Sequence, residues 1–251
     1  MSEASYEFGV VCEARADRDT ACGLADRVLL EEVSWLEPEM LGSYRLWRGT
    51  RPEMPFLKWA SVREECQRAG LKGIFGKFNG QPGQPDAYMA RLALLLLASS
   101  KKPPRAVLLV RDSDGDSRRR LGLEQARNDK PWPFPVVIGV AESKRECWVL
   151  AGFDPKSPQE AARLDMSERR LSFHPVRDAH RLDAREHGAK KDAKVALEEL
   201  TRGDMARERA CLEETPLPVL EERGGNIGLA DYLKEVRERL VPVLSGRSPE
   251  F

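Results

Sequence analysis

AVLLVRDSDGD, at residues 106–116, is the stretch that decides the fold expected of this chain. Its first five residues are continuously aliphatic, which is typical of a central strand in a parallel sheet covered on both faces. The acidic residues Asp112 and Asp114 follow directly. In open sheets of this kind the working residues lie at the carboxyl ends of the strands, so these two are the first candidates for a site.

Two further buried strands are expected, YEFGVVC at residues 6–12 and VVIGVA at residues 136–141. Both are short apolar runs rich in valine. Helical patterns fill the intervals between the strands, at residues 17–32, 59–69, 86–99 and 117–127. Strands that alternate with helices predict an α/β fold with a mostly parallel central sheet and flanking helices.

The chain changes character after the third strand and its helix. Residues 154–189 are polar, rich in arginine and contain all three histidines, which predicts irregular structure. Helices are then expected near residues 190–202, 204–214 and 228–241. We therefore expect an α/β core over residues 1–155. Over residues 156–251 we expect a polar linker and a helical C-terminal extension packed on that core.

The charge balance excludes one class of protein. The 251 residues include 41 Lys+Arg and 41 Asp+Glu, so the formal net charge is zero. A basic field over the whole surface, as used to coat nucleic acid, is therefore excluded, whereas a local basic groove is not.

The sequence shows no membrane or secretion signal. The longest apolar run, Leu92 to Ala98, is far shorter than the roughly 20 residues that span a bilayer, so no membrane contact is expected. The segment MSEASYEFG lacks the basic and apolar regions of a secretory signal. The 5 cysteines contain no C-x-x-C pair, which predicts neither a disulfide framework nor a zinc ribbon. We expect a cytoplasmic protein.

Acidic residues follow each of the three expected strands. Glu13 follows the first, with Asp17 one turn into the next helix, Asp112 and Asp114 follow the second, and Glu142 follows the third. Parallel strands bring these ends to one edge, where clustered carboxylates are costly unless cations neutralise them. Hard oxygen ligands suit Mg²⁺ or Mn²⁺, so the sequence predicts a site for such ions.

These motifs resemble a known family. FGVVCEARAD (8–17) followed by AVLLVRDSDGD resembles a TOPRIM domain, in which a Glu follows the first strand and an Asp-x-Asp a later one. The continuation VVIGVAESKRECWVLAGF (136–153) resembles small TOPRIM proteins related to the OLD-family nucleases. HGAKKDAKVAL (187–197) is loosely similar to the lysine-bearing segment of those nucleases. The resemblance covers residues 6–153, with a weaker trace beyond.

The resemblance implies a Mg²⁺- or Mn²⁺-dependent nuclease that hydrolyses phosphodiester bonds in DNA or RNA. Two ions would activate a water molecule and stabilise the leaving oxygen. Glu13 would be a metal ligand or the general base, and Lys190 or Lys191 would stabilise charge on the phosphate. The other implied metal ligands are Asp17, Asp112, Asp114 and Glu142.

Small TOPRIM proteins that resemble this chain often act with a separate ATPase, frequently in antiviral defence against phage. The sequence has no ATP-binding motif of its own, which is consistent with a partner ATPase. The alternative is a non-catalytic TOPRIM subunit that docks on such an ATPase. Either function is compatible with a homo-oligomer.

Two features depart from the family pattern. Ala14 stands where the family usually has Gly, so a positive φ at this position would change the loop. Glu13 and Asp112 are separated by 98 residues, which is long for a minimal TOPRIM core. We therefore expect an insertion at about residues 49–85.

The candidate residues also have explanations without this chemistry. Asp112 and Asp114 could form an acidic turn, part of a calcium loop, or the nucleophile pair of a phosphatase acting on a small molecule. Glu13 or Asp17 could cap the following helix, and Glu142 could be a surface residue. The two lysines could lie on a solvated helix face.

Overall fold

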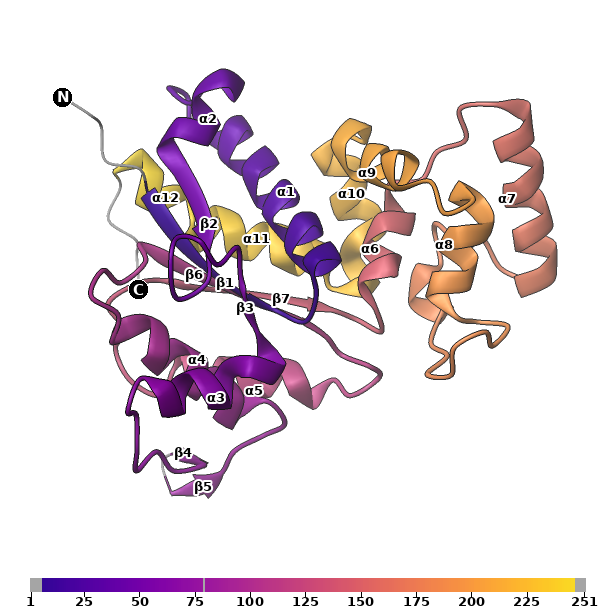
Figure 1. Cartoon of the computed structure of the whole chain (residues 1–251). Helices are drawn as coiled ribbons and strands as arrows, with labels where there is room; N and C mark the ends of the chain where they lie inside the picture. The colour runs from indigo at the N-terminus through magenta and orange to yellow at the C-terminus, as the bar shows by residue number, and fades with distance from the viewer. Residues whose placement is uncertain (1–5, 79, 247–251) are drawn as a thin grey trace. The chain divides into compact units, whose positions relative to one another are not determined.

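The fold is α/β, as predicted. The computed structural model describes residues 6–78 and 80–246. Its main sheet has the strand order β2-β1-β6-β7, and a short strand β3 also pairs with β1 (Figure 1). β1 runs parallel to β2, β3 and β6, which confirms a mostly parallel sheet. The strands are β1 (Tyr6–Cys12), β2 (Arg45–Arg48), β3 (Leu57–Lys58), β6 (Ala106–Asp112) and β7 (Val136–Ala141).

The described residues divide into two compact units. Unit 1 comprises the described residues up to Arg111, Ser117–Gly139 and the described residues from Lys234. Unit 2 comprises Asp112–Asp116 and Val140–Leu233. The last residues of β6 and β7 are therefore grouped with unit 2. The predicted division at residue 155 and the predicted insertion at about residues 49–85 stay predictions.

Unit 1 holds most of the sheet, with helices on both faces (Figure 1). The apolar runs read from the sequence are buried because each sheet face is covered. One face carries α3 (Val62–Arg68), α4 (Ala87–Ala98) and α5 (Arg118–Arg127), and the other carries α1 (Arg15–Glu32) and α12 (Val241–Ser245). The shorter elements are α2 (Pro38–Tyr44), η1 (Trp59–Ser61), β4 (Lys77–Phe78) and β5 (Gln81–Pro82).

A glycine sets the distance between two of these helices. A Cβ atom built on Gly122 of α5 would lie 1.8 Å from the backbone oxygen of Pro85, just before α4. No side chain fits at that distance, so α5 approaches the start of α4 only because residue 122 is glycine. The contact lies next to Asp86, the residue that precedes α4.

Unit 2 is helical, as expected for the C-terminal part of the chain. Trp148 is 1% exposed, stacks on Tyr232 with ring centroids 5.1 Å apart, and donates from Nε1 to the backbone oxygen of Ile227 at 2.7 Å. A buried indole with a satisfied N–H is a stable centre for a small core. The helices are α6 (Arg145–Ala151), α7 (Pro158–Leu171), η2 (Ala179–Arg181), α8 (Ala193–Thr201), α9 (Met205–Glu214), α10 (Leu217–Gly224), η3 (Gly225–Ile227) and the start of α11 (Leu229–Arg239).

The prediction that residues 154–189 are irregular is wrong, because this stretch contains α7. The Ser157 side chain accepts a hydrogen bond from the Glu160 N–H, and Pro158 occupies the first helical position. Both are helix-start signals. Two of the three buried residues on α7 are Glu160 and Ser167, so the helix lacks a clear apolar stripe. Arg207 of α9 instead holds α7 through Glu160, with Nε 2.8 Å from Oε1.

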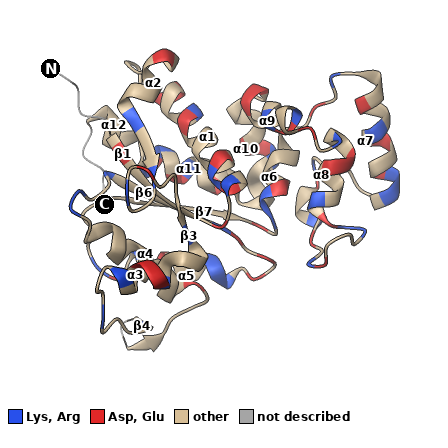
Figure 2. Ribbon diagram, in the orientation of Figure 1, with Lys and Arg blue, Asp and Glu red and all other residues tan. Residues whose placement is uncertain are grey.

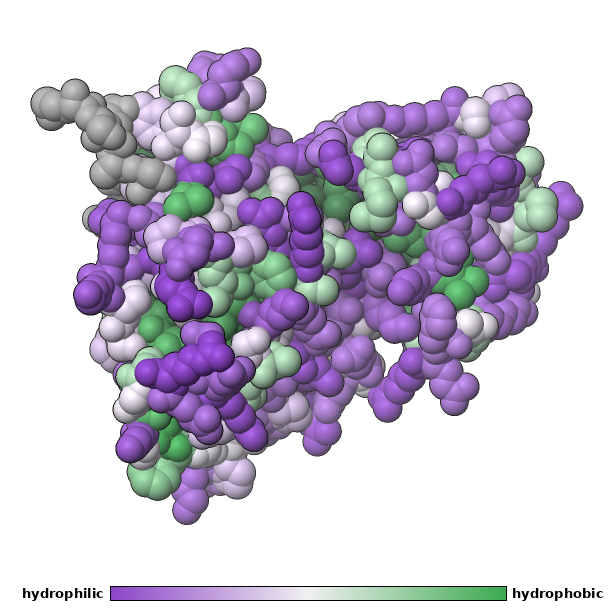
Figure 3. Space-filling model, in the orientation of Figure 1, coloured by the Kyte–Doolittle hydropathy of each residue, from purple (hydrophilic) through white to green (hydrophobic). Residues whose placement is uncertain are grey.

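The surface carries mixed charge. Figure 2 shows acidic and basic residues interspersed along the helices of both units. The face shown in Figure 3 is mainly hydrophilic, and in unit 1 its hydrophobic surface gathers around α3. Within residues 6–78 and 80–246, no helix has the length and apolar character needed to cross a membrane.

Candidate functional site

Glu13, the acidic residue after β1, lies beside an arginine. β1 and β6 pair with Val11 opposite Leu109, so continuing this register by two residues brings Glu13 level with Arg111. Arg111 Nη1 lies 2.8 Å from Glu13 Oε1, and the Glu13 side chain is 44% exposed. The guanidinium also donates from Nε to Asp86 Oδ2 at 3.1 Å. Glu13 therefore belongs to a network of opposite charges in unit 1.

Asp17 supports the start of α1. Its Oδ2 accepts a hydrogen bond from the Ala14 N–H at 2.8 Å. Ala14 has φ −140°, which is extended backbone, so alanine fits where the TOPRIM pattern has glycine. The contact satisfies a donor at the helix start, as the helix-capping explanation of Asp17 requires.

Asp112, the last residue of β6, is held by backbone. Its Oδ1 accepts a hydrogen bond from the Arg145 N–H, at the start of α6, at 2.9 Å. A hydrogen bond to an ionised carboxylate is strong and directional. The first carboxylate of the Asp-x-Asp motif is therefore oriented by a neighbouring loop of unit 2.

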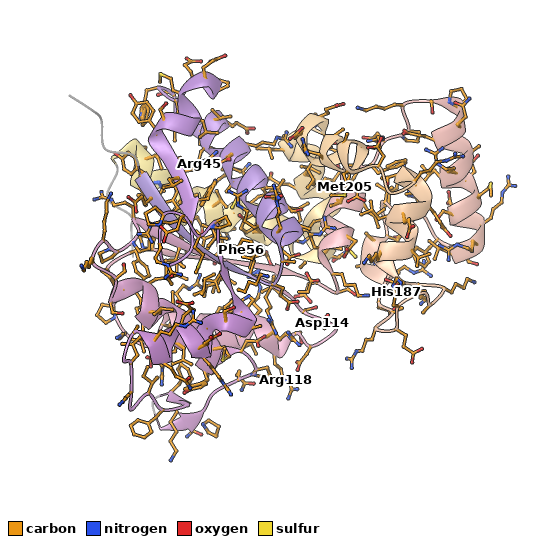
Figure 4. The ribbon with its side chains drawn as sticks, in the orientation of Figure 1. Arg45, Phe56, Asp114, Arg118, His187 and Met205 are labelled. Atoms are coloured by element: carbon orange, nitrogen blue, oxygen red, sulfur yellow. The ribbon has the colours of Figure 1, made fainter. Side chains whose placement is uncertain are left out.

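The residues after Asp112 form a tight turn. Asp114 and Gly115 both have positive φ, 48° and 75°. Ser113, between Asp112 and Asp114, is fully buried. Its Oγ accepts hydrogen bonds from the N–H groups of Ser143, at 2.8 Å, and Gly115, at 3.3 Å. Figure 4 labels Asp114 on this loop. Because the buried Ser113 oxygen satisfies these two backbone N–H groups, the turn is held in a defined conformation.

Glu142 follows β7 and lies next to that turn in the hydrogen-bond network. Its N–H donates to the Ile227 oxygen at 3.0 Å, while the N–H of Asp114 donates to the oxygen of Ser143 at 3.1 Å. The loops after β6 and β7 are thus joined residue by residue. The structure brings Asp112, Asp114 and Glu142 to adjoining loops of unit 2.

The two predicted lysines lie in the loop before α8 and are exposed. Lys191 Nζ lies 3.9 Å from Asp183 Oδ1, a long ion pair between exposed side chains. The backbone oxygen of Lys190 accepts a hydrogen bond from Arg170 at 2.6 Å. Their role toward a phosphate stays a prediction.

A buried carboxylate that sequence reasoning missed lies next to them. Asp192 is 0% exposed and receives hydrogen bonds from Lys144 Nζ at 3.1 Å, Gly188 N–H at 3.0 Å and Lys194 N–H at 3.1 Å. His187 is labelled in Figure 4, and its Nδ1 lies 3.2 Å from Oδ2 of Asp192. Burial alone would raise the pKa of Asp192, but these hydrogen bonds outweigh it and hold the pKa below its usual value.

The sequence contained signals for this cluster. Asp192 lies within HGAKKDAKVAL, a segment in which the sequence predicts a role for the lysines alone. An Asp before a helical run is an N-cap signal, and Asp192 does cap α8 through Lys194. Lys144 lies two residues after Glu142, close to the end of the predicted strand. Its link to Asp192, 48 residues away, could not be read from local pattern.

The donor chemistry after β6 and β7 fits a hard divalent cation, because Asp112, Asp114 and Glu142 all offer carboxylate oxygens. Their arrangement is not a formed metal centre. In the part of the chain that the structure describes, no three His, Cys, Asp or Glu side chains are grouped to hold an ion.

Comparison with family models, with curated proteins and with solved structures gives no match for this chain.

Proposed function

We propose that the chain is a Mg²⁺- or Mn²⁺-dependent nuclease of TOPRIM type, acting as the effector subunit beside a separate ATPase. The observation that carries the proposal is the order of the sheet. β1, β6 and β7 are neighbours, and an acidic residue follows each of them. This is the arrangement that the TOPRIM resemblance predicts.

The proposed cation ligands are Asp112, Asp114 and Glu142, on the adjoining loops of unit 2. When bound, a divalent cation would supply an activated water and a polarised phosphate oxygen. The chain's own contribution is to hold Asp112 through the Arg145 N–H and to fix the turn through Ser113. Glu13 belongs to unit 1, and its role as base or further ligand stays a prediction.

Lys144 joins the predicted lysines as a candidate for binding the phosphate. It follows β7 by three residues, its side chain is 20% exposed, and buried Asp192 fixes its ammonium group. Because the Lys144 ammonium group is already held in place, it loses little side-chain freedom when it binds an anion. Lys190 and Lys191 are exposed and lie in the loop that Asp192 ends.

Cleavage assays test the proposal directly. Plasmid DNA and total tRNA are incubated with wild type in Mn²⁺, Mg²⁺ or EDTA, with and without any ATPase encoded beside the chain. Asp112→Asn and Asp114→Asn should each lower metal-dependent cleavage by more than the roughly 10–100-fold typical of losing an outer-shell partner. Asp165→Asn, an exposed carboxylate on α7, is the matched control.

Glu13→Gln tests the remaining ligand separately. If Glu13 serves the reaction, this variant should lose cleavage while keeping its melting temperature, since the carboxylate is 44% exposed. If its only role is to pair with Arg111, cleavage should persist at the wild-type rate.

A second candidate function is a non-catalytic TOPRIM subunit that docks on a partner ATPase. The pairing of Glu13 with Arg111 favours it, because a guanidinium already neutralises that carboxylate. Absence of cleavage under every condition, together with absence of Mn²⁺ binding and stable co-elution with the ATPase, would support this candidate over the nuclease.

A further inference from the structure

A cavity of about 420 Å³ opens in unit 1. It is lined by Glu13 after β1, Trp59 and Ala60 of η1, Asp86 and Met89 at the start of α4, and Arg111 of β6. Segments far apart in the sequence meet there. Its size is within the range of pockets that bind small molecules.

Arg111 organises the cavity. Its Nη1 lies 2.8 Å from Glu13, its Nε donates to Asp86, and its guanidinium lies 5.7 Å from the centre of the Trp59 ring. The Trp59 N–H is itself fixed by the Val110 oxygen at 2.7 Å. A guanidinium has five N–H donors. Among the described residues, no acceptor lies on Arg111 Nη2, so this amino group remains for a ligand.

Asp86 can accept further hydrogen bonds. An ionised carboxylate accepts up to about four. Asp86 Oδ2 is shared by Arg111 Nε at 3.1 Å and Arg119 Nη1 at 3.5 Å, and its side chain is 16% exposed. The cavity therefore offers a donor, Arg111 Nη2, close to acceptors on Asp86 and Glu13. Met89, Ala60 and the edge of Trp59 supply apolar walls.

This pattern selects against charged ligands. A phosphate would meet two carboxylates, and a metal ion would meet the Arg111 guanidinium, so both would be repelled by part of the lining. A neutral planar ring with a carbonyl next to N–H groups would satisfy both partners and pack against the walls. Guanine has this edge, with O6 as acceptor beside the N1–H and N2–H₂ donors.

We propose that this cavity binds a guanine base, with O6 facing Arg111 and the N1–H and N2–H₂ groups facing the carboxylates. The choice of a nucleobase rests in part on the proposed nuclease function, which would supply such bases. The geometry does not depend on it. The base could belong to a free nucleotide or to a nucleic-acid strand, and both present the same edge.

Calorimetric titration in EDTA tests the inference without metal chemistry. Wild type is titrated with GMP, AMP, CMP and UMP, and with an oligo(dA) strand carrying one central guanine or none. GMP should bind at least tenfold more tightly than the other nucleotides. If the site serves strands, the guanine-containing oligonucleotide should exceed oligo(dA) by a similar factor. If the site binds free nucleotides, GMP should still bind more tightly than the other nucleotides, whereas the two oligonucleotides should bind equally.

Variants locate the binding. Arg111→Met should weaken GMP binding at least tenfold, and Ala60→Trp should do the same by filling the cavity from an exposed position. Arg51→Met, an exposed arginine elsewhere in unit 1, is the control and should bind like wild type. Circular dichroism checks that each variant is folded.

Two outcomes overturn the inference. One is equal affinity for all four nucleotides, and the other is unchanged GMP affinity in folded Arg111→Met and Ala60→Trp. Guanine binding without cleavage in any metal would leave this site standing and count against the nuclease. Cleavage without guanine binding would support the nuclease and count against this site.

Discussion

Arg111 and Asp112 are consecutive residues at the end of β6, yet they belong to different polar networks. Arg111 pairs with Glu13 and Asp86 and lines a cavity of unit 1. Asp112 accepts the Arg145 N–H and leads into the buried turn around Ser113 in unit 2. Successive side chains of a strand point to opposite faces of a sheet, so one strand end serves two environments.

The comparison shows that a carboxylate at a strand end is defined by its neighbours. Glu13 and Asp112 look equivalent in sequence, since both follow or end a buried strand. The register places a guanidinium beside Glu13, whereas Asp112 receives a neutral backbone donor. The two carboxylates therefore receive different donors, although both stand at the end of a buried strand.

The largest effect should come from breaking the unit 2 network at Asp192. Asp192→Ala removes a fully buried carboxylate and leaves Lys144 and two backbone donors without their acceptor. Breaking a buried ion pair costs about 3–5 kcal/mol of unfolding free energy. Urea titration followed by tryptophan fluorescence measures this loss. The control is Asp183→Ala, whose side chain is 67% exposed, and an equal loss in both would contradict the account.

Acid titration tests the contribution of Asp192 to stability in a second way. The folded pKa of Asp192 is held below its unfolded value by the hydrogen bonds that outweigh burial. Its stabilisation is therefore complete above the unfolded pKa of about 3.9, and it is lost as the pH falls through the lower folded value. Asp192→Asn should lose less stability than wild type between pH 5 and pH 2. Parallel pH profiles of the two proteins would contradict the assignment.

On the unit 1 side, Arg111→Met should have a smaller effect. It leaves Asp86, 16% exposed, with Arg119 at 3.5 Å, and removes the Arg111 contact from Glu13. We expect a loss of about 1–2 kcal/mol, the scale of leaving a partly buried polar group unsatisfied. Thermal melts compared with Arg51→Met measure it. Identical melting temperatures would mean that the network around Arg111 does not stabilise unit 1.

The smallest effect is expected at Asp17. Asp17→Ala removes the acceptor for the Ala14 N–H at the start of α1. Loss of such a contact typically costs about 0.5–1 kcal/mol. Asp19→Ala, which removes a 48% exposed carboxylate from the same turn region, is the matched control for thermal unfolding. A loss of metal-dependent cleavage in Asp17→Ala without loss of stability would instead make Asp17 a ligand.

Much of the fold could be predicted because it depends on local pattern. The apolar runs at 6–12, 106–110 and 136–141 form strands, since continuous aliphatic runs have few other stable environments. α7 escaped prediction because its buried face holds Glu160 and Ser167, and a partner on α9 stabilises it. Such a long-range ion pair leaves no periodicity in the sequence.

The site was harder to predict than the fold. Pattern located Asp112, Asp114 and Glu142 at strand ends, and the structure brings them to adjoining loops. Pattern did not locate Arg111 beside Glu13, because that depends on the register of β1 against β6. Nor did it indicate Asp192, whose burial depends on Lys144 from a distant loop. Pairings set by tertiary packing carry no local signature.

Mn²⁺ binding to the full chain, measured by calorimetry, tests the central claim that the carboxylates after β6 and β7 hold a divalent cation. We expect saturable binding to wild type, its loss in Asp112→Asn and in Asp114→Asn, and no change in Asp165→Asn. Absence of binding to folded wild type, or equal binding in the two loop variants, would contradict it.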